Sequence, residues 1–360
     1  MLDFIGLGNG LINIVLLLVI LVALVVIHEF GHFVVARWSR VRVHEFGIGF
    51  PPRAKVIGND GETTYTLNWL PIGGFVRLEG EEGESDDPRA FVRQSLRVRL
   101  TILLAGVAMN FLLAFLIFAA IAGLADPVFR VSIVEVQPAS PAATAGLVPD
   151  DQIVEIDGRR FYAFDGLGSA SDPISYLQAH AGEAVTLTVV GSNGVEREVE
   201  ATLRVPTQES PGALGISSRL GYYDATRDPV SAVSTGFDRT VDASTLILRS
   251  LGQFITNLGN PPVSGPVGIV GAIGLVREAL PPIFMLWFIG LLSANLAVVN
   301  ALPFPPLDGG RVAISLVQAV TGGRVSAAAE RLVYLTGFIL LMLLLAWVTL
   351  FDTGVLQRQL

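Results

Sequence analysis

Four long stretches of the chain are almost entirely apolar, and they decide what it can fold into. They lie at residues 11–36, 101–125, 282–302 and 332–351. Each matches or exceeds the ~20 residues that a helix needs to cross ~30 Å of hydrocarbon. Only 16% of the 360 residues are charged, whereas soluble domains carry about 25%. The sequence therefore predicts a polytopic α-helical membrane protein with about four transmembrane helices, the first of them retained rather than cleaved as a signal peptide.

The first apolar stretch carries three ionisable side chains in little more than one helical turn, in the order His28-Glu29-Phe30-Gly31-His32. Histidines at i and i+4 face the same side of a helix, where both imidazoles can reach one Zn²⁺, and the glutamate can act as a general base toward water. Ionisable groups at membrane depth are costly, and a bound metal would offset that cost. The pattern predicts zinc binding, and the alternative is a chance match to a short motif.

A catalytic zinc site needs a third protein ligand besides His28 and His32. The chain has no cysteine, so thiolate ligands are excluded. The third apolar stretch ends in the run from Asn300 to Gly310, whose three prolines and two glycines must break a helix. Broken backbone at membrane depth is tolerated only where protein buries it or where it lines a watery cavity. Asp308 in this run is the strongest candidate ligand, and the alternative is a loop carboxylate that begins a turn.

The arginines indicate the orientation of the chain. They gather at residues 37–42, 93–99 and 311–331, next to the ends of the apolar stretches. The positive-inside rule then places residues 37–100 and 308–331 in the cytoplasm, with both termini and residues 126–281 outside. The zinc motif is expected near the cytoplasmic face.

Residues 126–210 differ in pattern from the apolar stretches, because β-branched residues alternate with polar ones and no long apolar run occurs. Strands are expected at 131–136, 152–156, 185–190 and 195–205, and short helices at 140–145 and 173–179. The sequence from Pro138 to Gly158 resembles that of a bacterial PDZ domain, which implies peptide binding by strand addition. A small closed sandwich without a ligand is the alternative.

Two further segments complete the expected organisation. Residues 211–280 are assigned as a linker with an amphipathic helix between Asp228 and Asn257. Polar and apolar side chains alternate in parts of residues 44–78. This pattern predicts a β-rich, membrane-associated element on the cytoplasmic side. The expected domains are thus 1–125 with the zinc motif, 126–210, 211–280, and 281–360 with the third ligand. Residues 126–280 carry a net charge of −8, which makes nucleic acid an unlikely partner.

The two motifs together resemble those of the site-2 proteases, which are intramembrane zinc metalloproteases. That family carries HExxH on one transmembrane helix and N-x-x-P-x-x-x-L-D-G on a later one, here Asn300 to Gly309. The resemblance implies that His28, His32 and Asp308 bind Zn²⁺ and that Glu29 is the catalytic base. Asn295 and Asn300 would bind substrate, while Asn110 in the second apolar stretch is expected to make an interhelical hydrogen bond.

The same resemblance implies an endopeptidase of the bacterial cytoplasmic membrane. Its substrates would be single-span membrane proteins such as anti-sigma factors or signal-peptide remnants, first trimmed by a site-1 type protease. The β-rich element would hold the unwound substrate as an added strand. Two other functions stay open on the residues alone: a metal-ion transporter, since broken helices also build ion sites, and an inactive PDZ scaffold.

Overall fold

The computed structural model describes residues 4–81, 85–165, 172–207, 212–256, 264–322 and 327–354. The chain divides into two compact units. We call Met1–Ile117 with Ala243–Leu360 the membrane unit, and Phe118–Asp242 the β unit.

Four helices in the described part of the chain are long and apolar enough to cross a membrane. They are α1 (Phe4–Trp38), α2 (Leu96–Leu124), α7 (Ile283–Ala301) and α9 (Ala327–Asp352). They are apolar around most of their circumference, as expected for helices that contact both protein and lipid. The four predicted spans are confirmed as helices.

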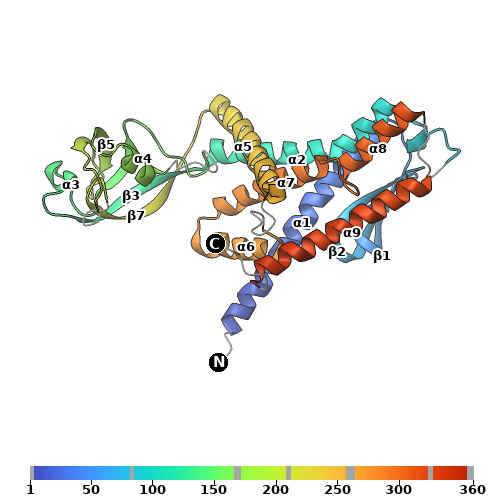
Figure 1. Cartoon of the computed structure of the whole chain (residues 1–360), viewed down its shortest axis with the longest axis horizontal. Helices are drawn as coiled ribbons and strands as arrows, with labels where there is room; N and C mark the ends of the chain where they lie inside the picture. Colours follow the sequence, from blue (N-terminus) through green and yellow to red (C-terminus); the bar gives the residue numbers. More distant parts are fainter. Residues whose placement is uncertain are drawn as a thin grey trace. The chain divides into compact units, whose positions relative to one another are not determined.

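A long β-hairpin follows α1 in the membrane unit. Its strands β1 (Val43–Asn59) and β2 (Thr64–Leu78) pair antiparallel, and Figure 1 shows them beside α1. A short 3₁₀ helix (Phe91–Arg93) leads from the hairpin to α2. An apolar cluster fixes the base of the hairpin to α1 and α2, with Ala36, Val41, Val43, Leu78, Phe91, Ile102 and Leu103 buried. The predicted β-rich element is confirmed.

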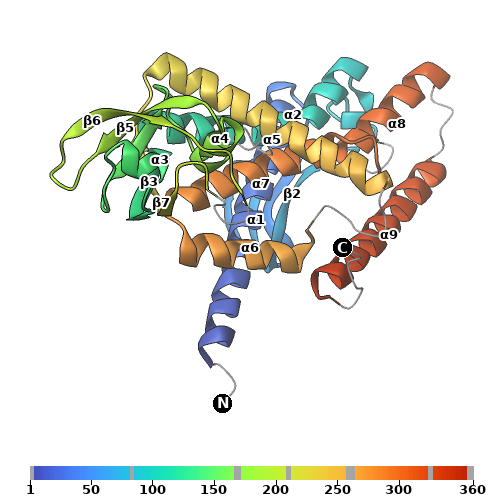
Figure 2. The ribbon, with the colours of Figure 1, turned by 60° about the vertical axis from the view of Figure 1, so that its left-hand side comes forward.

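The last part of the membrane unit brings two shorter helices against the spans. Helix α6 (Pro266–Ala279) crosses α1 (Figure 2), and Asn13 of α1 packs on Gly274. The carboxylate of Asp352, at the end of α9, accepts a hydrogen bond of 2.9 Å from the Gly268 amide. This bond satisfies a free amide in the first turn of α6 and ties that turn to α9. Six residues separate the end of α7 from helix α8 (Asp308–Thr321).

The β unit contains a five-stranded antiparallel sheet in the order β6-β5-β4-β3-β7. The strands are β3 (Asp126–Val136), β4 (Gln152–Ile156), β5 (Ala184–Val190), β6 (Glu196–Thr202) and β7 (Ile216–Ala225). Two short helices, α3 (Pro141–Thr144) and α4 (Pro173–Ala179), accompany the sheet. Its core is mostly aliphatic, and the largest fully buried members are Ile133, Ile156 and Leu187.

Both short helices and four strands of the β unit lie where the sequence predicts them, whereas β7 was not predicted. It falls in residues 211–280, which the sequence analysis assigned to a linker and helix. Most side chains of β7 are exposed or half-buried, because it forms one edge of the sheet. The apolar alternation that predicts a strand is therefore missing, and pairing with β3 over the whole length of β7 holds it in place.

Buried charges hold the start of β3 against helix α5 (Pro229–Thr256). Asp126 is fully buried, and its carboxylate accepts hydrogen bonds from Arg239 at 2.9 Å and Arg227 at 2.8 Å. Both arginines also bind Asp165 at 2.8 Å. Burial raises the pKa of Asp126 above its usual value, and the two guanidinium groups oppose that shift. Helix α5 confirms the helix predicted between residues 228 and 257, of which Asn257 lies outside the described residues.

Candidate metal centre and active site

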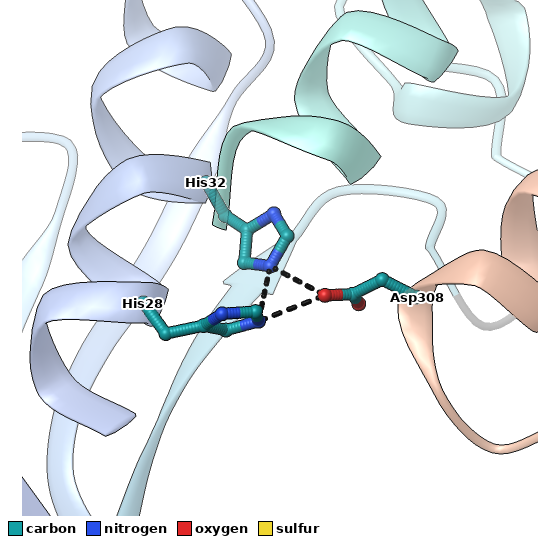
Figure 3. Close-up of side chains that lie close together, drawn as sticks. All are labelled: His28, His32 and Asp308. Atoms are coloured by element: carbon teal, nitrogen blue, oxygen red, sulfur yellow. Dashed lines mark hydrogen bonds and ion pairs between the residues drawn. The ribbon is translucent and has the colours of Figure 1, made fainter. Parts of the chain in front are cut away.

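Three side chains from opposite ends of the chain meet in the membrane unit. His28 and His32 project from the same side of α1 toward Asp308 at the start of α8 (Figure 3). The Nε2 atoms of the two histidines are 3.1 Å apart, and Asp308 Oδ2 lies 2.8 Å from His28 Nε2 and 3.3 Å from His32 Nε2. Both histidines are buried. The structure thus brings together the three residues that the sequence predicted as metal ligands.

The donor set and its spacing fit zinc. Two imidazole nitrogens and one carboxylate oxygen are the ligands of many catalytic zinc sites, which keep a fourth position open for water. With bonds of about 2.0–2.2 Å, neighbouring ligand atoms of a tetrahedral site lie about 3.3 Å apart. The three distances within the cluster are close to that value, so His28, His32 and Asp308 can hold one ion.

The position of Asp308 follows from the break between α7 and α8. Three prolines between residues 302 and 307 lack the amide hydrogen that a helix needs, so α7 ends at Ala301. Asp308 then becomes the first residue of α8, where the helix dipole favours a negative charge. A Cβ atom at Gly310 would lie 2.7 Å from the backbone of Phe304 and Pro305. The absence of a side chain at Gly310, two residues after Asp308, therefore lets α8 fold back closely on the broken segment.

Helix α2 forms the back wall of the ligand cluster, and Gly106 is its point of closest approach. A Cβ atom at this position would lie 2.7 Å from His28 Nε2 and closer still to His32 Nε2. The Nε2 atoms of the two histidines thus face the space in front of Gly106. A glycine leaves that space free, and any other residue would fill it.

Glu29 and the ligand cluster share one cavity of about 1410 Å³. Side chains of α1, α7, α8 and α9 line it together with the end of β2, from Gly73 to Leu78. Of the two asparagines predicted to bind substrate, Asn300 lines the cavity, whereas Asn295 is not among its described lining residues. The predicted base, one predicted substrate residue and the three predicted metal ligands therefore line a common cavity.

His44 also lines the cavity but is engaged elsewhere. Its Nε2 atom contacts Glu79 at 2.5 Å. The pKa of Glu79 lies below its usual value because Ser85 and His44 hydrogen-bond to its carboxylate. Among the described residues, the group that could hold a metal consists of His28, His32 and Asp308, without His44.

Helix α2 also contacts the far nitrogens of both histidines. His32 Nδ1 lies 2.7 Å from the Ile102 carbonyl oxygen, and His28 Nδ1 lies 3.3 Å from the side-chain amide of Asn110. The interhelical hydrogen bond predicted for Asn110 is therefore confirmed. Its partner, His28, was not predicted. The available signal was the spacing of Gly106 and Asn110, which puts both on one face of α2.

Known proteins match nearly the whole chain. The family model of peptidase family M50 matches residues 16–344. A protein of Clostridium acetobutylicum, whose name assigns it provisionally to the zinc metalloproteases, is 35% identical over 343 residues, covering 94% of this chain and 97% of that protein. The zinc metalloprotease RasP of Geobacillus kaustophilus is 29% identical over 420 residues, with 94% and 96% covered.

These matches confirm the family that the two motifs predicted, along with the enzyme class and the metal. Because four apolar helices accompany the match, the protein is integral to the membrane. The chain belongs to peptidase family M50, the site-2 proteases, and is a zinc metalloprotease.

Proposed function

We propose that this protease cuts transmembrane segments of other membrane proteins, with His28, His32 and Asp308 as zinc ligands and Glu29 as general base. One observation carries the proposal: the three donor atoms lie together on a cavity that also contains Glu29. Membrane-spanning helices contribute to the walls of that cavity. A peptide bond could reach the site from within the bilayer, where a transmembrane substrate already lies.

The chemistry divides between the metal and the chain. When bound, Zn²⁺ would act as a Lewis acid that polarises a carbonyl and lowers the pKa of water, so that water can lose a proton and attack at neutral pH. Glu29 takes the proton from the attacking water and delivers it to the departing amine. Asn300 would hold the substrate backbone through its side-chain amide. Its position in the cavity lining supports this role, and Asn295 lacks that support. A metal-ion transporter would need no general base beside the metal.

A transmembrane substrate must unwind before attack, because a helix hides its carbonyl groups. Residues 73–78 of β2 line the cavity, and a Cβ atom at Gly74 would lie 3.7 Å from the Glu29 side chain. One side of β2 pairs with β1, and the described residues place no strand on its other side. An unwound substrate could therefore pair with this edge beside the base.

The arrangement in the membrane belongs to the same proposal. The arginine distribution favours a cytoplasmic-side active site, with both termini and the β unit outside. The β unit has the strand-and-helix content of a PDZ-like module and would exclude substrates with bulky outer domains or bind a newly cut peptide end. Cleavage would then follow trimming by a site-1 type protease. Single-span substrates such as anti-sigma factors or signal-peptide remnants suit this scheme.

The test is cleavage of a reporter with one transmembrane segment, reconstituted with the purified protease in lipid. We expect cleavage within the segment, loss of cleavage with a zinc chelator and recovery with added Zn²⁺. Glu29→Gln should retain zinc but cut about 10²–10⁴-fold more slowly, because an amide cannot accept the proton. Near-normal turnover by the zinc-loaded Gln variant would remove Glu29 from the mechanism.

A further inference from the structure

The two ligand histidines must each adopt one tautomer for their Nε2 atoms to bind a metal. A neutral imidazole carries its proton on one ring nitrogen and accepts with the other. In the cluster it is Nε2 of both rings that faces Asp308. Each Nδ1 must therefore carry the proton and needs a hydrogen-bond acceptor.

His32 has such an acceptor in the backbone of α2. Its Nδ1 atom donates to the carbonyl oxygen of Ile102 at 2.7 Å. Any residue at position 102 would supply the same oxygen, so this contact does not depend on a side chain. The corresponding position for His28 is occupied by the Asn110 side chain. Its amide nitrogen Nδ2 lies 3.3 Å from His28 Nδ1.

Asn110 presents both a donor and an acceptor in this place. The residue is fully buried, and its side-chain oxygen has no hydrogen-bond partner among the described residues. Amide nitrogen and oxygen exchange places on a half-turn of the terminal torsion. With nitrogen toward His28, the ring must accept at Nδ1 and would carry its proton on Nε2, which cannot then bind a metal. With oxygen toward His28, Nδ1–H donates and Nε2 is free.

We propose that Asn110 is a positioning residue whose side-chain oxygen accepts the Nδ1 proton of His28 and so holds this ligand in its metal-binding tautomer. Ile102, Gly106 and Asn110 follow one another at four-residue intervals and therefore share one face of α2. The face supplies one acceptor for each histidine and an open space between them. The Ser293 hydroxyl donates to the Asn110 backbone carbonyl at 2.9 Å, a contact that does not involve the Asn110 side chain. Partners of this kind raise the basicity of a ligand histidine and fix its ring orientation.

The experiment measures zinc affinity of the purified full-length protein by competition with a chromophoric chelator. Asn110→Leu, which is similar in size and has no acceptor, should weaken binding about 10–100-fold. Asn110→Asp, whose carboxylate can accept but not donate, should stay near the wild type. Ser293→Ala is the matched control, because it removes only the bond to the Asn110 backbone, and its affinity should not change.

Melting with and without zinc separates positioning from packing. Bound zinc raises the melting temperature by an amount set by its affinity, so Asn110→Leu should shrink the difference between the two forms. A packing role would lower both temperatures and leave the difference unchanged. Wild-type zinc affinity in Asn110→Leu overturns the proposal, and so does an aspartate variant as weak as the leucine one. Asn110→Ala serves the same comparison if the leucine variant does not fold. None of these readouts needs proteolysis, so the proposal can fail while the proposed function stands.

Discussion

At the scale of single residues, the absence of a side chain at Gly106 matters as much as the ligands. Gly106→Ala would place a methyl group 2.7 Å from His28 Nε2, in the space where a metal would lie. We expect the purified variant to lose most of its zinc while remaining folded, as measured by metal analysis and circular dichroism. Gly271→Ala in α6 is the control, because a Cβ atom there meets nothing within 4 Å. Full zinc occupancy in the Gly106 variant would show that the ion binds elsewhere.

Asp308→Ala should lower both zinc content and activity, because two histidines alone leave the site with two protein ligands. His44→Ala should keep its zinc, since His44 is paired with Glu79 rather than with the cluster. The pair of variants separates ligation from general damage to the cavity, which both residues line. Zinc retained by the Asp308 variant would assign the third ligand to another carboxylate, and zinc lost from the His44 variant would revise the ligand pair.

The sequence predicted that His28, His32 and Asp308 would lie together, because the argument depends on residue spacing and on membrane depth. His28 and His32 are one turn apart on any helix, and Asp308 ends the other apolar stretch with the same expected direction. The role of Asn110 toward His28 could not be predicted in the same way. It depends on how closely α2 approaches α1, and that distance is fixed by tertiary packing of residues far apart in sequence.

At the scale of elements, the buried charges around Asp126 should hold β3 against α5. Asp126 is fully buried, and Arg239→Met leaves it with Arg227 as its remaining arginine partner. Breaking a buried pair in this way costs about 3–5 kcal/mol, so the β unit should become more sensitive to protease and unfold at a lower temperature. Arg160→Met breaks a half-exposed pair with Glu155 and should change stability by about 1 kcal/mol or less. Equal effects of the two variants would contradict the role of the network.

The edge strands show where local sequence stops being informative. β4 matches its prediction because it is rich in branched apolar residues, and two of them, Ile153 and Ile156, are buried in the core. β7 carries serine, arginine and glycine on mostly exposed positions. Its strand conformation is therefore decided by the backbone groups that β3 offers, and no pattern within β7 predicts that partner.

At the scale of the whole molecule, the β unit should control which substrates are cut. Because Val128 pairs with Tyr223 across β3 and β7, residues 128–223 can be replaced by a short glycine linker without leaving an unpaired strand. We expect this deletion to keep zinc bound and to allow cleavage of an untrimmed membrane substrate that the full chain rejects. The assay compares trimmed and untrimmed reporters. A folded, zinc-loaded deletion variant that still cuts only the trimmed form would place selection within the membrane cavity.

The proposed ligands come from distant parts of the chain, because His28 and Asp308 are 280 positions apart in sequence. During synthesis the two histidines leave the ribosome long before the aspartate does. A chain whose translation stops before α8 carries an HExxH motif but cannot complete the ligand set. If the three side chains bind the metal as proposed, such a product cannot damage neighbouring membrane proteins, because proteolytic capacity arises only once α8 has been made.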